Sequence, residues 1–128
     1  MKLLLDTCTF LWTINGSPQL SAKVRALIAD RQNEVFLSAV SAWEITVKYS
    51  LGKLPLPQPP SEFVPAERTR HEITALPLAE QACMAVGRLP ELHKDPFDRM
   101  LVCQSIIEGL TLLTPDPLIT QYPVAVLW

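Results

Sequence analysis

Three short, largely apolar runs constrain the fold of this chain more than any other feature of its sequence. They occupy residues 3–5, 35–37 and 111–113, and each is followed at once by polar residues. Continuous apolar runs of this length are typical of strands that are covered on both faces, as in a parallel sheet. Helical patterns alternate with them, which predicts an α/β fold: a three-layer α/β/α sandwich with a mostly parallel central sheet.

The remaining elements follow from turn signals and helix-start signals. Ser21 is a natural helix cap, and proline-rich residues 53–60 cannot be regular helix or central strand, so a rigid extended loop is expected there. The expected helices are 10–14, 22–29, 61–70 and 79–86, and two further strands are expected at 72–76 and 124–127. At 128 residues the chain is interpreted as one domain, residues 1–128.

Two helix starts carry acidic residues that have an ordinary structural explanation. Asp95 can cap a helix with Pro96 at its first position, and Asp98 would then lie at the positive end of the helix dipole. Ser41 and Glu44 have the spacing of a capping box, in which the glutamate folds back onto its own helix start. Considered singly, these acids need no catalytic role.

Considered together, the acids indicate a site. Two of them follow predicted strands and the others open helices, and the five are Asp6, Glu44, Asp95, Asp98 and Asp116. Strand ends and helix starts share one edge of a parallel sheet, so these carboxylates should converge and raise one another's pKa unless cations lie between them. Mg²⁺ and Mn²⁺ prefer such oxygen ligands, and two ions ~4 Å apart could activate a water for attack on a phosphodiester. The pattern predicts metal-dependent phosphoryl chemistry.

Other enzyme classes fit the sequence less well. A haloacid-dehalogenase-like phosphatase needs a second aspartate two positions after Asp6, where Cys8 stands. A response-regulator receiver needs a lysine at a late strand end, and residues 113–115 offer none. Gly-rich phosphate loops and the G-x-S-x-G elbow of serine hydrolases are also absent from the sequence.

Composition leaves the class of substrate open. The net charge of −2 does not indicate nucleic-acid binding. The negative charge of an acidic cluster would, however, be neutralised by cations bound in the working protein. Three widely spaced cysteines indicate a reducing compartment, and neither a signal peptide nor a membrane span is expected, so a cytoplasmic location is predicted.

His93 is interpreted as a solvated surface residue rather than a phosphate or metal contact, and Trp12 and Trp43 as packing residues.

Four segments of the chain, in order, resemble the signature segments of PIN domains. They are LLLDT at 3–7, SAWEI at 41–45, HKDPFDRML at 93–101 and LLTPD at 112–116. Within that family they are similar to VapC-type ribonuclease toxins of bacterial toxin-antitoxin pairs. The resemblance implies a Mg²⁺- or Mn²⁺-dependent endoribonuclease that hydrolyses RNA phosphodiester bonds with metal-activated water, and it implies two protein contacts, a homodimer and a cognate antitoxin whose tail covers the acidic pocket.

The resemblance also implies residue roles. Catalytic and metal-binding roles fall on Asp6, Glu44, Asp98 and Asp116, while Asp95 is either a further metal ligand or only the cap. Secondary roles fall on three more residues: Thr7 and Thr114 would orient the acids or a water, and Arg99 would face phosphate or pair with a neighbouring acid.

Two departures from the family pattern bear on these roles. Cys8 replaces a small polar residue, and Pro117 could hold Asp116 away from the metals. An exposed apolar area is expected near Phe10, Trp12, Tyr49 and the proline-rich loop. The alternative function is a non-catalytic PIN-like module that binds RNA or protein and uses its acids only as helix caps.

Overall fold

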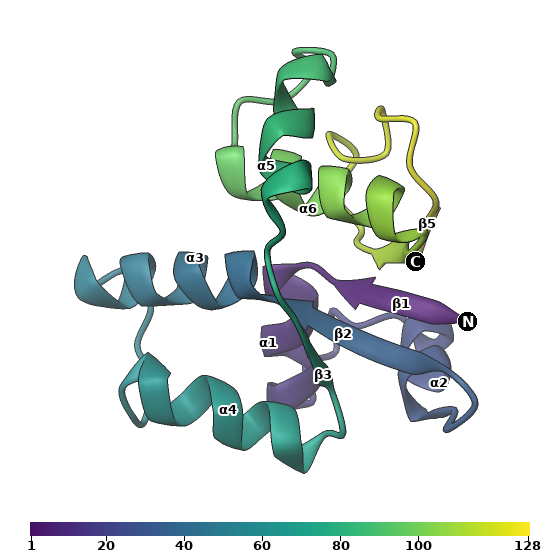
Figure 1. Cartoon of the computed structure of the whole chain (residues 1–128). Coiled ribbons are helices and arrows are strands. Elements are labelled where there is room, and N and C mark those ends of the chain that lie inside the picture. Colours follow the sequence, from purple (N-terminus) through teal and green to yellow (C-terminus); the bar gives the residue numbers. More distant parts are fainter.

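The computed structural model describes residues 1–128 and places five strands in one parallel sheet (Figure 1). The strand order across the sheet is β3-β2-β1-β4-β5. The strands are β1 (Lys2–Leu5), β2 (Glu34–Ser38), β3 (Thr74–Leu76), β4 (Thr111–Leu113) and β5 (Val126–Leu127). The prediction of a mostly parallel sheet is confirmed, and every paired neighbour is in fact parallel.

Six α-helices and one 3₁₀ turn connect the strands. They are α1 (Thr7–Asn15), α2 (Ala22–Ala29), α3 (Ala39–Ser50), α4 (Pro60–Arg70), α5 (Glu80–Ala85), η1 (Val86–Arg88) and α6 (Pro96–Glu108). Helices α1 and α6 both end at a glycine in the left-handed conformation, with φ of 61° at Gly16 and 66° at Gly109. No helix is both long and apolar enough to span a membrane.

The pleat of the central strand β1 divides the hydrophobic core in two. Leu3 and Leu5 belong to one buried cluster and Leu4, between them, belongs to the other. Helices α1, α2 and α4 pack into the first cluster, whereas α6 packs into the second through Leu101 and Val102. Helices therefore cover both faces of the sheet, as Figure 1 shows for α1 and α4 on one side and α6 on the other, and the three-layer prediction is confirmed.

The predicted exposed apolar area is wrong for one of its three residues. Phe10 is fully buried in the first core cluster, because it lies on the face of α1 that packs against the sheet. Trp12 is half-buried, and its ring meets the ring of Trp128 edge-on with the centroids 5.8 Å apart. Tyr49 is exposed as expected.

Helix α3 begins three residues earlier than the capping-box pattern predicted. Ser38, the last residue of β2, is its N-cap, and the Ser38 hydroxyl accepts a hydrogen bond of 2.9 Å from the backbone N–H of Val40. Ser41 is thus fully buried inside the first turn, and Glu44 lies in the second turn, where it cannot cap the helix start. The capping interpretation of Glu44 is wrong.

Candidate active site

All five acids singled out in the sequence line one pocket of about 290 Å³. It lies at the carboxyl edge of the sheet, where β1 runs into α1 and where the chain leaves β4. The predicted convergence of Asp6, Glu44, Asp95, Asp98 and Asp116 is therefore observed. The other lining residues are Thr7, Cys8, Trp12, Lys48 and Pro115, so that Lys48 is the only lysine or arginine in the pocket wall.

Asp6 is a buried carboxylate that also caps α1. Its Oδ1 accepts a 2.8 Å hydrogen bond from the backbone N–H of Thr9, and only 5% of the residue is exposed. Burial raises the pKa of Asp6, the negative charge of Glu44 raises it further, and hydrogen bonds from Thr114 and Thr9 partly oppose this shift. The surroundings of Asp6 therefore disfavour its negatively charged form.

Glu44 is equally buried and is held from two sides. The Thr7 hydroxyl donates to its Oε1 at 2.6 Å, and Thr7 Oγ1 also lies 3.0 Å from the Ser41 hydroxyl. Its other oxygen, Oε2, forms an ion pair of 2.5 Å with Lys48 Nζ one turn along α3. The hydrogen bond to Glu44 raises the pKa of Lys48, which keeps the ammonium charged. Thr7 thus contacts one of the acids directly.

The start of α6 presents two carboxylates with different surroundings. Asp95 is the N-cap, and its Oδ1 accepts from the backbone N–H groups of Phe97 at 2.9 Å and Asp98 at 3.3 Å. The predicted cap is confirmed. Burial raises the pKa of Asp98 to about 6; its hydrogen bond with His93 opposes the shift, and the charges of Asp95, Glu44 and Asp6 add to it.

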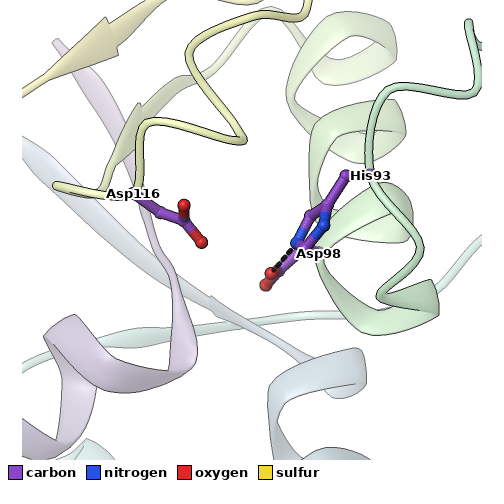
Figure 2. A group of neighbouring side chains, drawn as sticks. All are labelled: His93, Asp98 and Asp116. Atoms are coloured by element: carbon purple, nitrogen blue, oxygen red, sulfur yellow. Dashed lines mark hydrogen bonds and ion pairs between the residues drawn. The ribbon is translucent and has the colours of Figure 1, made fainter.

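His93 does not lie free on the surface, so the sequence interpretation of this residue is wrong. Its side chain is only 14% exposed, and its Nε2 lies 2.9 Å from Asp98 Oδ2 in a shared hydrogen bond. Figure 2 shows His93 and Asp98 directed toward the same space as Asp116, which enters from the loop after β4. One ligand atom from each of these three residues lies within 4.8 Å of the other two.

Asp116 faces the other acids despite the proline that follows it. One carboxylate oxygen accepts from the backbone N–H of Leu118 at 2.9 Å, and the Thr114 hydroxyl accepts from the backbone N–H of Asp116 at 3.1 Å. Thr114 is fully buried and also donates toward Asp6, which ties the β4 loop to the end of β1. The expectation that Pro117 holds Asp116 away from the site is not met.

Arg99 fills neither of the roles that the resemblance implied. Its guanidinium donates to the backbone carbonyls of Pro90 and Val86, at 2.8 and 3.2 Å, and to the Tyr122 hydroxyl at 3.1 Å. No carboxylate is within ion-pair distance, and Arg99 is not part of the pocket wall. Arg99 instead fastens the segment between α5 and α6, from which His93 projects.

We expect Arg99→Lys to lower the free energy of unfolding by about 1–3 kcal/mol, because a lysine cannot span two carbonyls and a hydroxyl. A urea titration followed by circular dichroism measures the change. Arg88→Lys is the matched control, since Arg88 is an exposed arginine on the same segment, and it should leave stability unchanged. Unchanged stability in Arg99→Lys would contradict the clamping role.

The thiol of Cys8, an exposed residue that lines the pocket, is held in its protonated form. Burial and the nearby charges of Asp6 and Glu44 raise the pKa of Cys8 to about 11, so the thiol stays protonated at neutral pH. Sequence reasoning did not single out Lys48 as a partner of Glu44, although the i, i+4 spacing of the two residues on one helix was a usable signal. The contact between Ser41 and Thr7 was not predicted, because Ser41 was taken to be the helix cap in place of Ser38.

The PIN-domain family model matches residues 3–124. The chain belongs to the PIN-domain family. The chain is also similar to Ribonuclease VapC16 of Mycobacterium tuberculosis, with 46% identity over 90 residues. That alignment covers 55% of this chain and 64% of VapC16, so it spans less than two thirds of the length of the relative.

Solved structures share the fold of this PIN domain over nearly its whole length. The crystal structure of VapBC2 from Rickettsia felis bound to a promoter DNA fragment matches with a TM-score of 0.74 at 17% identity, covering 99% of this chain and 98% of that one. DNA-bound VapBC from Salmonella typhimurium matches at 0.71 with 20% identity, covering 99% and 97%. FitAcB from Neisseria gonorrhoeae matches at 0.62 with 22% identity, covering 98% and 96%.

The donor set of this PIN domain fits a divalent cation. Asp6 and Asp98 have raised pKa values because burial and neighbouring acids disfavour their charges, and a single lysine faces the pocket. Two positive charges placed among these oxygens would reverse the penalty. Asp98 and Asp116 already present carboxylate oxygens to one space, next to the His93 nitrogen.

Proposed function

We propose that this PIN domain is a Mg²⁺- or Mn²⁺-dependent endoribonuclease and acts as the toxin of a toxin-antitoxin pair. The observation that carries this proposal is the convergence of five acids from four separate segments on one pocket with a single lysine. The similarity to Ribonuclease VapC16 supports RNA as the substrate. If the acids served only as caps, Glu44 would not be buried in the second turn of a helix.

The proposed metal ligands are the carboxylates of Asp6, Glu44, Asp98 and Asp116, with Asp95 as a further ligand that also caps α6. When bound there, divalent cations lower the pKa of water and stabilise the charge that develops on a phosphodiester. The chain itself supplies the fixed positions of the oxygens. Each acid lies at a strand end, at a helix start or in a helix that is anchored in the core.

Residues around the acids hold them in place. Thr7 and Lys48 each fix one oxygen of Glu44, at 2.6 and 2.5 Å. The cap formed by Asp95 sets the first turn of α6 and hence the direction of Asp98. Such support limits reorganisation during the reaction, because the carboxylates already point into the pocket.

Two lining residues are suited to contact RNA. The Lys48 side chain is 46% exposed, so its ammonium can reach a phosphate while it remains paired with Glu44. Trp12 contributes half-buried aromatic surface to the pocket wall, and its edge contact with Trp128 holds the ring in place. A positive charge and an aromatic ring beside a narrow pocket suit an unpaired strand, in which bases can stack on the ring.

A cognate antitoxin and a second copy of the chain are the proposed protein partners. Solved structures that share this fold include VapBC complexes from three bacteria. Large apolar side chains are also exposed on α3 and at its end, with Trp43 at 56% and Leu51 at 63% exposed. Apolar residues at this level of exposure are suited to burial against another protein.

The test is cleavage of total RNA by the purified chain with Mg²⁺ or Mn²⁺, with and without EDTA. We expect fragments that appear only with metal and that Asp30→Asn leaves unchanged, because Asp30 is an exposed aspartate at the end of α2, outside the pocket. RNA binding without metal-dependent cleavage would favour the non-catalytic alternative.

A further inference from the structure

We infer that His93 is a nitrogen ligand to the divalent cation of this site and that it makes the site prefer Mn²⁺ to Mg²⁺. The inference rests on the proposed metal dependence and deepens it. Its basis is the group in Figure 2, in which an imidazole nitrogen and two carboxylates from separate segments face one space.

The distances suit one shared ion. His93 Nε2 and Asp98 Oδ2 are 2.9 Å apart, and neighbouring ligands at the ~2.1 Å bond length of an octahedral site lie about 3 Å apart. One ligand atom from each of His93, Asp98 and Asp116 lies within 4.8 Å of the other two, a limit that accommodates the ~4.2 Å between opposite ligands in such a site. A cation would replace the proton that now bridges His93 and Asp98.

The chain holds His93 in this position by contacts on both sides of it. Arg99 binds the carbonyls of Val86 and Pro90 on the segment before His93, and Asp95 caps the helix after it. The imidazole is 14% exposed and contacts Asp98, a residue of the pocket wall, although His93 is not itself among the lining residues. A nitrogen donor is therefore fixed next to Asp98.

The identity of the donor atom decides the metal preference. Mg²⁺ takes oxygen ligands almost exclusively and keeps several waters, so an imidazole adds little to its binding. First-row transition ions accept imidazole nitrogen, and among them Mn²⁺ is the one that shares the preference of Mg²⁺ for carboxylate and water ligands. A site with one imidazole and several carboxylates should therefore bind Mn²⁺ more tightly than Mg²⁺.

A competing explanation is that His93 only positions Asp98 through the hydrogen bond. His93→Gln separates the two roles, because the glutamine amide can still donate to Asp98 but is a poor metal ligand. His71→Gln is the matched control. It replaces the chain's only other histidine, which lies 3.6 Å from Glu67 and just before β3, at the opposite edge of the sheet from the acids.

The experiment adds Mn²⁺ to the full chain and records pulsed electron paramagnetic resonance, which detects ¹⁴N of a coordinated imidazole. We expect a ¹⁴N coupling in the wild-type protein and in His71→Gln, and none in His93→Gln. Calorimetric titrations should show Mn²⁺ affinity falling about tenfold or more in His93→Gln while Mg²⁺ affinity changes little. Circular dichroism melting confirms that each variant is folded.

Two results would overturn the inference while leaving the proposed function intact. One is Mn²⁺ binding to the wild-type protein without ¹⁴N coupling, and the other is an equal loss of Mn²⁺ and Mg²⁺ affinity in His93→Gln. If the wild-type chain bound neither ion, both the inference and the proposed metal dependence would be wrong.

Discussion

Asp6→Asn is expected to reduce metal-dependent RNA cleavage by more than about a hundredfold. Loss of a residue that merely supports a metal ligand typically costs about 10–100-fold, and Asp6 is proposed as a ligand itself. The substitution changes one oxygen to an amide nitrogen at a 5% exposed position, so the shape of the pocket is preserved. Initial rates of RNA cleavage at saturating Mn²⁺ measure the effect.

The same substitution should raise the melting temperature of the metal-free protein. Burial raises the pKa of Asp6, which means that its charge opposes folding, and asparagine removes the charge. Asparagine also caps helices as well as aspartate does, so the start of α1 should be maintained. Asp30→Asn again serves as the control. A fall in melting temperature together with the loss of activity would show that Asp6 acts mainly as a structural cap.

Much of this arrangement could be predicted because its signals are local. The continuous apolar run of β1 and the start of α6 each lie within a few neighbouring residues. The rule that strand ends and helix starts share one edge of a parallel sheet then brings the acids together without knowledge of the strand order. Three of the four segments that supply them were placed correctly for this reason.

The errors arose where tertiary contacts decide the outcome. Ser38 and Ser41 are both serines that could cap α3, and only the point at which β2 leaves the sheet selects Ser38. Arg99 donates to backbone carbonyls in a separate segment. Every residue has a backbone carbonyl, so the residue types of that segment could not predict this contact. The burial of His93 depends on the same segment, because the path of the chain before α6 sets it against Asp98.

The second large effect is a dependence of stability on pH that divalent ions should reverse. The pKa of Asp98 is raised to about 6 in the folded protein from an ordinary value of 3.8, so the folded state holds this proton more tightly than the unfolded state. Stability from this group is therefore lost as pH rises from about 4 through about 6, and the raised pKa of Asp6 acts in the same direction.

Melting curves with EDTA or with Mn²⁺, taken from about pH 5 to about pH 7.5, measure this dependence. With EDTA the melting temperature should fall as pH rises, and Asp98→Asn should flatten that fall. Protons compete with the ion for the same oxygens, so the stabilisation by Mn²⁺ should grow with pH, reaching about 2.7 kcal/mol when the ion is at a hundred times its dissociation constant. A metal effect that is independent of pH would contradict this account of the acids.

The strand order has a consequence for the time at which the acidic pocket can be completed during synthesis. Strand β1 pairs in the middle of the sheet with β4, and Asp6 and Asp116 lie just past the ends of these two neighbours. A ribosome that has made the first hundred residues has already incorporated Asp6, Glu44 and Asp98 but has not yet made β4 or Asp116. The nascent chain consequently lacks a complete acidic pocket until β4 takes its place beside β1, so no metal site that needs Asp116 can form before the last strands of the sheet are made.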